Sequence, residues 1–286
     1  MIILLFGKNG QVGLALQRYL PKNIHLISKS KEEVDFTSAD EIKKSIRSSN
    51  PNFIINAAAY TDVEKAELDS EKVFQINAYA PEQIALEAKK LKIPFIHLST
   101  DYVFDGSGDM PWKPNDKVNP INEYGKSKSE GERRIVKIDC EYCILRTSWI
   151  FSQDNKNFLK TIINLSNKNS SISIIDDQIG GPTSSKSIAE ACFKIIQAHS
   201  NNHFVQGVFH FSGYPYVSWA EFAEAIIYLT KAKATVKKIA SSKFKTIAVR
   251  PKNSRLNCDS LFSTYNIKQS SWKTDLENVI EDLIKK

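Results

Sequence analysis

The N-terminal stretch most constrains the fold, because a short apolar run leads directly into spaced glycines. Ile2–Phe6 is entirely apolar, and Gly7, Gly10 and Gly13 follow before a helical pattern that continues to about Tyr19. A buried strand, a glycine turn and a helix form the context of a dinucleotide-binding fingerprint. The spacing is a variant, G-x-x-G-x-x-G rather than G-x-G-x-x-G. We expect the glycines to let the backbone approach a pyrophosphate at a helix N-terminus; a plain tight turn is the alternative.

Strand-like runs alternate with helical patterns along the first half of the chain. Strands are expected at Ile2–Phe6, Ile24–Ile27, Phe53–Asn56, Phe95–Leu98, Tyr142–Arg146, Ile172–Ile175 and Val208–Phe211. Such alternation predicts an α/β fold, a Rossmann-like doubly wound parallel sheet with helices on both faces. We expect residues 1–150 to form a dinucleotide-binding domain to which a segment near 171–200 returns. Residues 151–286 would mainly form a smaller C-terminal substrate-binding lobe.

Composition and charge narrow the class of protein further. The chain has 286 residues and a formal net charge of +7, but its lysines are scattered rather than striped. We therefore expect no nucleic-acid partner, and a polyphosphate ligand explains the mild excess as well. No stretch of about 18 apolar residues occurs, so neither a transmembrane helix nor a membrane partner is expected. Met1–Phe6 is too short for a signal peptide, which predicts a cytoplasmic protein.

The four cysteines do not form a metal-binding or redox pattern. Cys140 and Cys143 have C-x-x-C spacing, but no second pair accompanies them and they lie in a strand-like run. Cys192 and Cys258 are isolated. We interpret all four as reduced structural thiols.

Small and polar residues follow four of the expected strands. Gly7, Ala57–Thr61, Thr100 and Trp149 all occupy such positions. Ligands of doubly wound sheets bind outside the carboxyl ends of the strands, so these residues predict a site at that edge. His97 alternates with apolar neighbours inside its strand, and we interpret it as structural.

A tyrosine and a lysine four residues apart are the candidate catalytic pair. Tyr124 and Lys128 would lie on one face of a helix that runs to about Val136. An adjacent ammonium favours the phenolate, and lowering a tyrosine pKa from about 10 to about 7 takes roughly 4 kcal/mol. The pattern alone also fits a surface pair on a solvated helix. The glycine turn and the Ser99–Asp101 segment favour the catalytic interpretation.

Two basic segments bear on ligand choice. Ser28–Lys31 ends the second strand, with no acid before Glu32. An acid at this point would favour NADH, so the hydroxyls and lysines predict a preference for NADPH, with NADH possible. Arg250–Arg255 is a basic loop. It is interpreted either as a diphosphate clamp or as a solvated loop.

Several motifs resemble those of the extended short-chain dehydrogenase/reductase superfamily, and within it the dTDP-4-dehydrorhamnose reductase family. The resemblance covers nearly the whole chain. The motifs are Phe6–Gly13, Asn56–Thr61 with Lys65–Glu67, Ser99–Gly106, Tyr124–Lys128, Arg146–Trp149, Asp177–Gln178 with Pro182–Thr183, and Arg250–Pro251 with Asn253–Leu256. The implied reaction is reduction of the 4-keto group of dTDP-4-dehydro-L-rhamnose. A reductase of a related 4-keto-6-deoxy nucleotide sugar and a non-catalytic dinucleotide-binding regulatory subunit are the alternatives.

The resemblance also implies residue roles. Tyr124 would donate a proton to the keto oxygen, Lys128 would hold the nicotinamide ribose and lower the tyrosine pKa, and Thr100 would bond the same oxygen. The expected cofactor contacts are Gly7, Gly10, Gln11, Val12, Ser28, Lys29, Asp35, Phe36, Ala57, Ala59, Tyr60, Thr61, Ser99, Tyr124 and Lys128. The expected substrate contacts are Thr100, Asp101, Tyr124, Trp149, Arg250 and Arg255.

Assembly is the last expectation. Some family members resemble one another in forming dimers bridged by Mg²⁺ through glutamates, one of them a few residues after the Pro182–Thr183 pair. This chain has Lys186 in that neighbourhood, and a lysine cannot ligate Mg²⁺. We therefore expect no metal and a monomer or metal-free homodimer.

Overall fold

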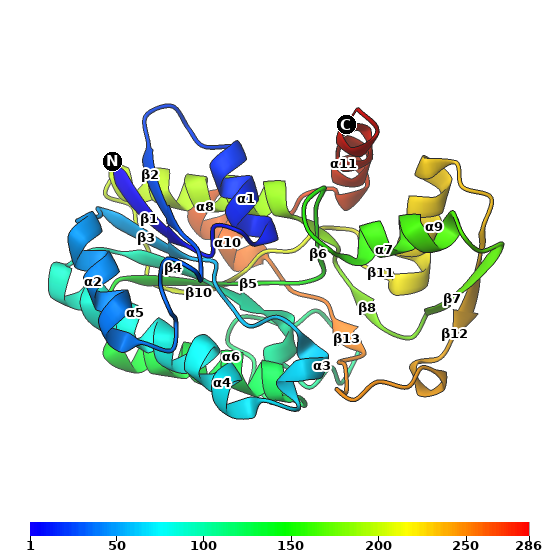
Figure 1. The fold of residues 1–286 in the computed structure, drawn as a ribbon, viewed down its shortest axis with the longest axis horizontal. Helices are drawn as coiled ribbons and strands as arrows, with labels where there is room; N and C mark the ends of the chain where they lie inside the picture. The colour runs from blue at the N-terminus through cyan, green and yellow to red at the C-terminus, as the bar shows by residue number, and fades with distance from the viewer. Residues whose placement is uncertain (286) are drawn as a thin grey trace.

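The computed structural model describes residues 1–285, and a six-stranded parallel sheet forms the centre of its larger part (Figure 1). The strand order is β10-β5-β4-β3-β1-β2, and every neighbouring pair is parallel. The strands are β1 (Ile2–Phe6), β2 (His25–Lys29), β3 (Phe53–Asn56), β4 (Phe95–Thr100), β5 (Tyr142–Thr147) and β10 (Gly207–His210). The predicted α/β doubly wound sheet is confirmed.

Helices cover both faces of this sheet, because its strands are apolar on both sides. Ile3 and Leu5 pack toward one face, where α1 (Gln11–Arg18), α8 (Ser185–Ser200) and α10 (Asp259–Tyr265) lie. Leu4 and Phe6 pack toward the other face, which α2 (Ala39–Ser49), α5 (Ala80–Leu91) and α6 (Glu123–Ile138) cover. Each fully buried side chain of this size contributes about 1.5–3 kcal/mol relative to an exposed one.

The topology reverses at β1. This strand pairs with β2 on one side and with β3 on the other, so the chain crosses over β1 between them. Ligands of open α/β sheets bind in the crevice at such a switch point. The chain after β3 runs through α3 (Val63–Ala66), α4 (Ser70–Phe74) and a π-helical turn, Gln75–Tyr79, before α5. These short elements lie beside the predicted crevice.

A smaller lobe lies at the carboxyl edge of the sheet (Figure 1). Its helices, α7 (Phe158–Ser166), α9 (Trp219–Thr230) and α11 (Trp272–Ile284), enclose a separate apolar core that includes Phe151, Ile226 and Trp272. A capping box starts α9, since Ser218 and Glu221 each bond the other's backbone. Three small sheets complete the lobe: β6 (Ile150–Phe151) with β9 (Thr183–Ser184), β7 (Ser171–Ile175) with β12 (Thr235–Ile239), and β8 (Ile179–Gly180) between β11 (Val217–Ser218) and β13 (Asn253–Ser254).

The segment expected to return to the first domain near 171–200 divides between the two parts. Helix α8 packs on the six-stranded sheet, and β10 then joins that sheet. Strand β7 instead pairs with β12 in the smaller lobe. The returning segment therefore begins at Ser185, because β7 is half exposed and finds its partner strand in the lobe.

The four cysteines are free and buried. Burial raises the pKa of the Cys140 thiol to about 11. Within residues 1–285, no helix combines the length and the apolar character that crossing a membrane requires.

Candidate active site

The glycine turn after β1 packs directly against the end of β3. Gly7 has φ +92, and a Cβ there would lie 2.6 Å from the carbonyl carbon of Ala57, so this position excludes other residues. Gly10 is the N-cap of α1 and contributes no side-chain cap. The backbone N–H groups of Gln11 and Val12 belong to the first turn, which has no acceptors within the helix. The end of α1 is therefore an anion-binding position.

A cavity of about 580 Å³ opens beside this helix end, at the switch point between β1 and β3. Eight of the predicted cofactor residues line it: Gly7, Gly10, Asp35, Phe36, Ala57, Ala59, Tyr60 and Thr61. Ser30, Lys31 and Lys72 line it as well. Its size and its position over an uncapped helix N-terminus fit a dinucleotide whose pyrophosphate faces α1.

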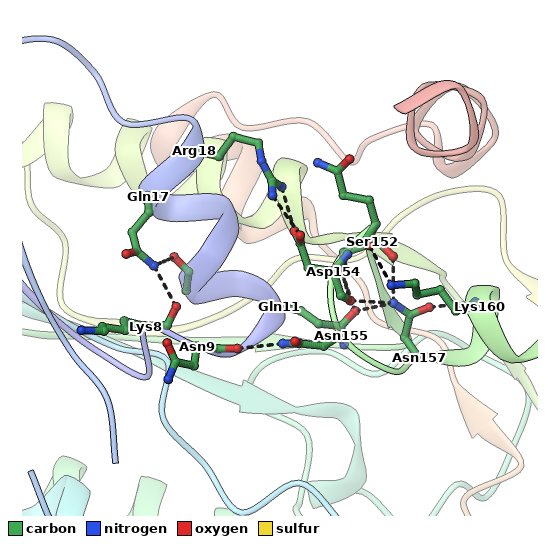
Figure 2. Close-up of polar contacts among 12 residues, drawn as sticks. Lys8, Asn9, Gln11, Gln17, Arg18, Ser152, Asp154, Asn155, Asn157 and Lys160 are labelled. Carbon is green, nitrogen blue, oxygen red and sulfur yellow. Dashed lines mark hydrogen bonds and ion pairs between the residues drawn. The ribbon is translucent and has the colours of Figure 1, made fainter. Parts of the chain in front are cut away.

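The side chains of Gln11 and Val12 point away from this cavity, so the prediction that they contact the cofactor rests on their backbone. Gln11 Oε1 accepts hydrogen bonds from Ser152 Oγ at 2.8 Å and Asn157 Nδ2 at 3.0 Å, on the loop before α7 (Figure 2). Val12 is buried in the core beneath α1. On a helix, neighbouring residues face different directions, so only the backbone of these two residues remains available to a ligand.

Three further predicted cofactor residues also have side chains outside the cavity. Ser28 Oγ donates to Gln17 Oε1 on α1. Lys29 ends β2, and its carbonyl oxygen accepts the N–H groups of Gly7 and Lys8. Ser99 donates to Glu132 on α6. We predicted that the second strand ends at Ile27, but β2 continues two residues further, to Lys29. The lining of the cavity therefore begins at Ser30.

Tyr124 lies at the start of α6, next to the end of β4. Asn122 caps this helix by accepting the N–H of Gly125 at 2.8 Å. Burial raises the pKa of Tyr124 to about 12, and a hydrogen bond with the Thr100 side chain partly opposes it. The direction is opposite to the expected lowering, since Lys128 is not among the groups that shift this pKa. Thr100 and Tyr124 are nonetheless brought together as predicted.

Lys128 follows one turn later on α6 and is 1% exposed. Its Nζ donates to Leu98 O at 2.7 Å and lies 3.1 Å from His97 Nε2. Burial lowers the pKa of Lys128 to about 8. The lysine is thus held against β4, close to the predicted proton donor in sequence and structure.

Asn77 is a site residue that the sequence analysis missed. Its Oδ1 accepts the N–H of Tyr60 at 2.8 Å, and its Nδ2 donates to Tyr60 O and to Ser127 Oγ. It therefore joins the cavity turn to α6 from within the π-helical turn. Such single π turns occur often at functional sites, but no residue pattern predicts one here.

Two of the predicted substrate residues, Asp101 and Arg250, have buried polar atoms without a protein partner. Asp101 is 2% exposed, accepts from Thr100 Oγ1 at 3.1 Å, and has no partner for Oδ2. Burial raises the pKa of Asp101 to about 7, and the neighbouring hydroxyl groups of Ser254 and Thr100 partly oppose this shift. Arg250 Nη2 pairs with Glu64 Oε1 at 2.6 Å, while its Nη1 is buried without a partner.

Trp149 and Arg255 are already engaged by neighbouring residues. The Trp149 ring is stacked on Trp219 with centroids 3.5 Å apart, and its other side lies against Gly180. Arg255 Nη1 donates to Asn253 Oδ1 at 3.0 Å. The two predicted arginines therefore have different environments, and only Arg250 has an unpaired buried donor in the structure.

This fold and site define an extended short-chain dehydrogenase/reductase: a parallel sheet, a glycine turn on a dinucleotide-sized cavity, and a Thr/Tyr/Lys group beside it. A family model described as the RmlD substrate binding domain matches residues 1–285. The dTDP-4-dehydrorhamnose reductase of Sinorhizobium fredii is 36% identical, covering 97% of this chain and 96% of that protein. That of Escherichia coli K12 is 34% identical, with coverages of 99% and 98%.

Solved structures agree with these relatives. The dTDP-4-dehydrorhamnose reductase of Clostridium acetobutylicum superposes with a TM-score of 0.94 at 35% identity and covers 100% of both chains. The Bacillus anthracis enzyme, solved in complex with NADP, has a TM-score of 0.93 at 30% identity, covering 98% of this chain and 99% of that one. The chain belongs to the dTDP-4-dehydrorhamnose reductase family.

Proposed function

We propose that this protein reduces the 4-keto group of dTDP-4-dehydro-L-rhamnose to give dTDP-L-rhamnose, a precursor of surface polysaccharide, with NADPH as the preferred reductant. The observation that carries the proposal is the placement of the Thr100 side chain against Tyr124 at the end of β4, with Lys128 one helical turn away. Residues 1–150, together with α8 and β10, would bind the dinucleotide. The lobe within 151–286 would hold the sugar.

Tyr124 is suited to donate the proton. Its pKa of about 12 keeps the phenol protonated at neutral pH, so the proton is in place before the reaction. A bound reduced nicotinamide supplies the hydride to the carbonyl carbon. As negative charge develops on the keto oxygen, Tyr124 transfers its proton there and the Thr100 hydroxyl donates a hydrogen bond. Lys128 then stabilises the phenolate that remains.

The sugar nucleotide would be held by Asp101, Trp149, Arg250 and Arg255. Arg250 Nη1 is a buried guanidinium donor without a protein partner, which matches a diphosphate oxygen. Asp101 Oδ2 is a buried acceptor without a partner, which matches a sugar hydroxyl. Trp149 would contact the sugar with the edge of its indole ring, which is stacked on Trp219. Arg255 lies in the same loop as Arg250.

The preference for NADPH rests on the cavity lining. Lys31 and Lys72 are exposed cations at its edge, and Ser30 lies between β2 and Lys31. Exposed ion pairs contribute at most about 1 kcal/mol each, so we expect a preference on the order of tenfold, with NADH still usable. Comparing kcat/KM for the two cofactors tests this. Lys31→Ala and Lys72→Ala should reduce the preference, whereas Lys29→Ala, outside the cavity, is the matched control.

The activity itself is tested by NADPH consumption with a panel of 4-keto-6-deoxy nucleotide sugars. Oxidation of NADPH by dTDP-4-dehydro-L-rhamnose with release of dTDP-L-rhamnose is the expected result. Turnover only with a different sugar or nucleobase would identify the related-sugar reductase. Tight NADPH binding without turnover of any member would favour the regulatory subunit instead.

A further inference from the structure

A chain of buried polar groups connects the turn at the cavity to the catalytic lysine. The Ala58 N–H donates to Asn56 Oδ1 at 3.1 Å, and Asn56 Nδ2 lies 3.1 Å from His97 Nδ1. His97 Nε2 lies 3.1 Å from Lys128 Nζ, which donates to Leu98 O. Asn56 and His97 are 0% exposed, so bulk water does not substitute for these contacts.

The direction of these hydrogen bonds is determined at the Asn56 end. The Asn56 carbonyl oxygen is committed to a backbone N–H, so its amide nitrogen must face the imidazole. Burial lowers the pKa of His97 well below its usual range, and the ring is therefore neutral. A neutral imidazole has one N–H and one acceptor nitrogen. Because Nδ1 accepts from Asn56, the hydrogen must be on Nε2.

This tautomer discriminates between the two forms of Lys128. An Nε2–H can donate to the lone pair of a neutral amine, whereas an ammonium group has three donors and no acceptor. Protonated Lys128 would thus place two donors face to face at 3.1 Å. Such a mismatch between two buried donors disfavours the protonated form of the lysine.

Other groups near Lys128 do not reverse this preference. Glu132, one turn further on α6, favours the ammonium form, but its carboxylate is paired with Arg146 Nη2 at 2.6 Å. Tyr124, one turn earlier, is a protonated phenol at neutral pH. Asn77, from the π-helical turn, bears no charge. Burial of Lys128 acts in the same direction as His97, because it lowers the lysine pKa.

We propose that Asn56 and His97 are positioning residues that hold Lys128 toward its neutral form and thereby set the upper pH limit of the reductase reaction. This hydrogen-bonded chain of Asn56, His97 and Lys128, here called the relay, is present without any substrate. Its consequence for turnover rests on the proposed function. Since Lys128 acts as a cation beside Tyr124, turnover should fall as the pH rises through the Lys128 titration. The relay moves that fall to lower pH.

The tautomer of His97 is the direct test. Long-range ¹H–¹⁵N NMR on the cofactor-free, full-length protein distinguishes an Nε2–H ring from an Nδ1–H ring, and His97→Gln assigns the signal among the five histidines. We expect the Nε2–H tautomer. An Nδ1–H ring or an imidazolium at His97 would overturn the proposal without reference to any activity.

Asn56→Asp tests the effect on the lysine. A carboxylate can only accept, so the His97 hydrogen should move to Nδ1 and leave Nε2 as an acceptor for the ammonium group. The ¹³Cε titration of Lys128, assigned by its loss in Lys128→Met, should then move at least one pH unit upward. The falling limb of kcat/KM should move with it.

Asn77→Asp is the matched control for charge, because it places a buried carboxylate next to Ser127 without touching His97. The shift in Asn56→Asp should exceed that in Asn77→Asp, and only Asn56→Asp should change the tautomer. Equal shifts would show that charge alone acts on Lys128, which would refute the relay. Absence of turnover with every sugar would contradict the proposed function and leave the NMR result intact.

Discussion

Single buried groups at the end of β4 give the site its acid–base character. Tyr124 and Asp101 both have raised pKa values because both are withdrawn from water, yet the consequences differ. For the phenol, burial secures the protonated form that a proton donor needs. For the carboxyl, burial produces an acid that titrates near neutral pH.

Tyr124→Phe should lower turnover by a factor of about 10² or more, the range for a lost general acid. The fold and NADPH binding should change little, because the ring and its edge contact with Tyr102 remain. Single-turnover kinetics and cofactor titration measure the two effects separately. Near-normal turnover in this variant would remove Tyr124 from its proposed role.

Asp101 makes stability depend on pH. Its pKa of about 7 in the folded state lies above its ordinary value of 3.8, so between these values the folded state binds more protons than the unfolded state. Stability therefore falls as the pH rises through that interval, by up to about 1.4 kcal/mol per pH unit. Asp101→Asn should lose less Tm between pH 5 and pH 8 than the wild type does. Asp109→Asn, exposed on the following loop, is the control and should behave like wild type.

At the scale of elements, α6 places the proposed catalytic groups by packing closely at its first turn. A Cβ on Gly125 would lie 2.2 Å from Tyr102 O, a distance that no side chain tolerates. The helix therefore rests on the backbone that follows β4. This close approach brings Tyr124 to Thr100.

Gly125→Ala should shift the first turn of α6 and reduce both stability and turnover. Overpacking of this kind costs about 1–3 kcal/mol, and we expect turnover to fall at least tenfold because Tyr124 moves with the helix. Thermal unfolding and kcat check the two effects. Ser129→Ala, on the next turn of the same helix, should leave both nearly unchanged, and a silent Gly125→Ala would contradict the close contact.

Elements with a strong periodic pattern could be predicted from the sequence, whereas side-chain directions near their ends could not. The buried strand Phe53–Asn56 begins with three apolar residues, and the structure has it at the predicted position. Ser28 was misplaced because β2 continues two residues beyond its predicted end, so that the cavity lining begins at Ser30. Strand β12 was missed because Thr235–Ile239 is largely exposed and carries two lysines. Asn77 was missed because its role depends on a π-helical turn that has no sequence signature.

At the scale of the molecule, the two parts meet at α1. Arg18 binds Asp154 through two hydrogen bonds of 2.7 and 2.9 Å, and Gln11 binds the same loop (Figure 2). Asn155 Nδ2 donates to Asn9 O, in the glycine turn itself. The N-terminal end of α1, where we propose that the pyrophosphate binds, is therefore tied to the lobe that would hold the sugar. The two parts share no sheet, and these contacts help to hold the residues that each part contributes to the site in place relative to one another.

The last prediction concerns assembly. Lys186 lies 4.0 Å from Glu190 and over the ring of Tyr19, so a cation already occupies this part of α8. Ser184 and Ser187 both donate to Asp275, so hydroxyl groups already engage this carboxylate. Within residues 1–285, no three His, Cys, Asp or Glu side chains are grouped to hold a metal.

We expect a chelator to change neither the mass in solution nor the NADPH-dependent turnover, because a lysine repels Mg²⁺. Light scattering and activity assays with and without EDTA measure both, with Lys186→Glu as the variant in which Mg²⁺ could begin to matter. A dimer of the wild-type protein that dissociates on chelation would show that a metal bridges two copies despite Lys186.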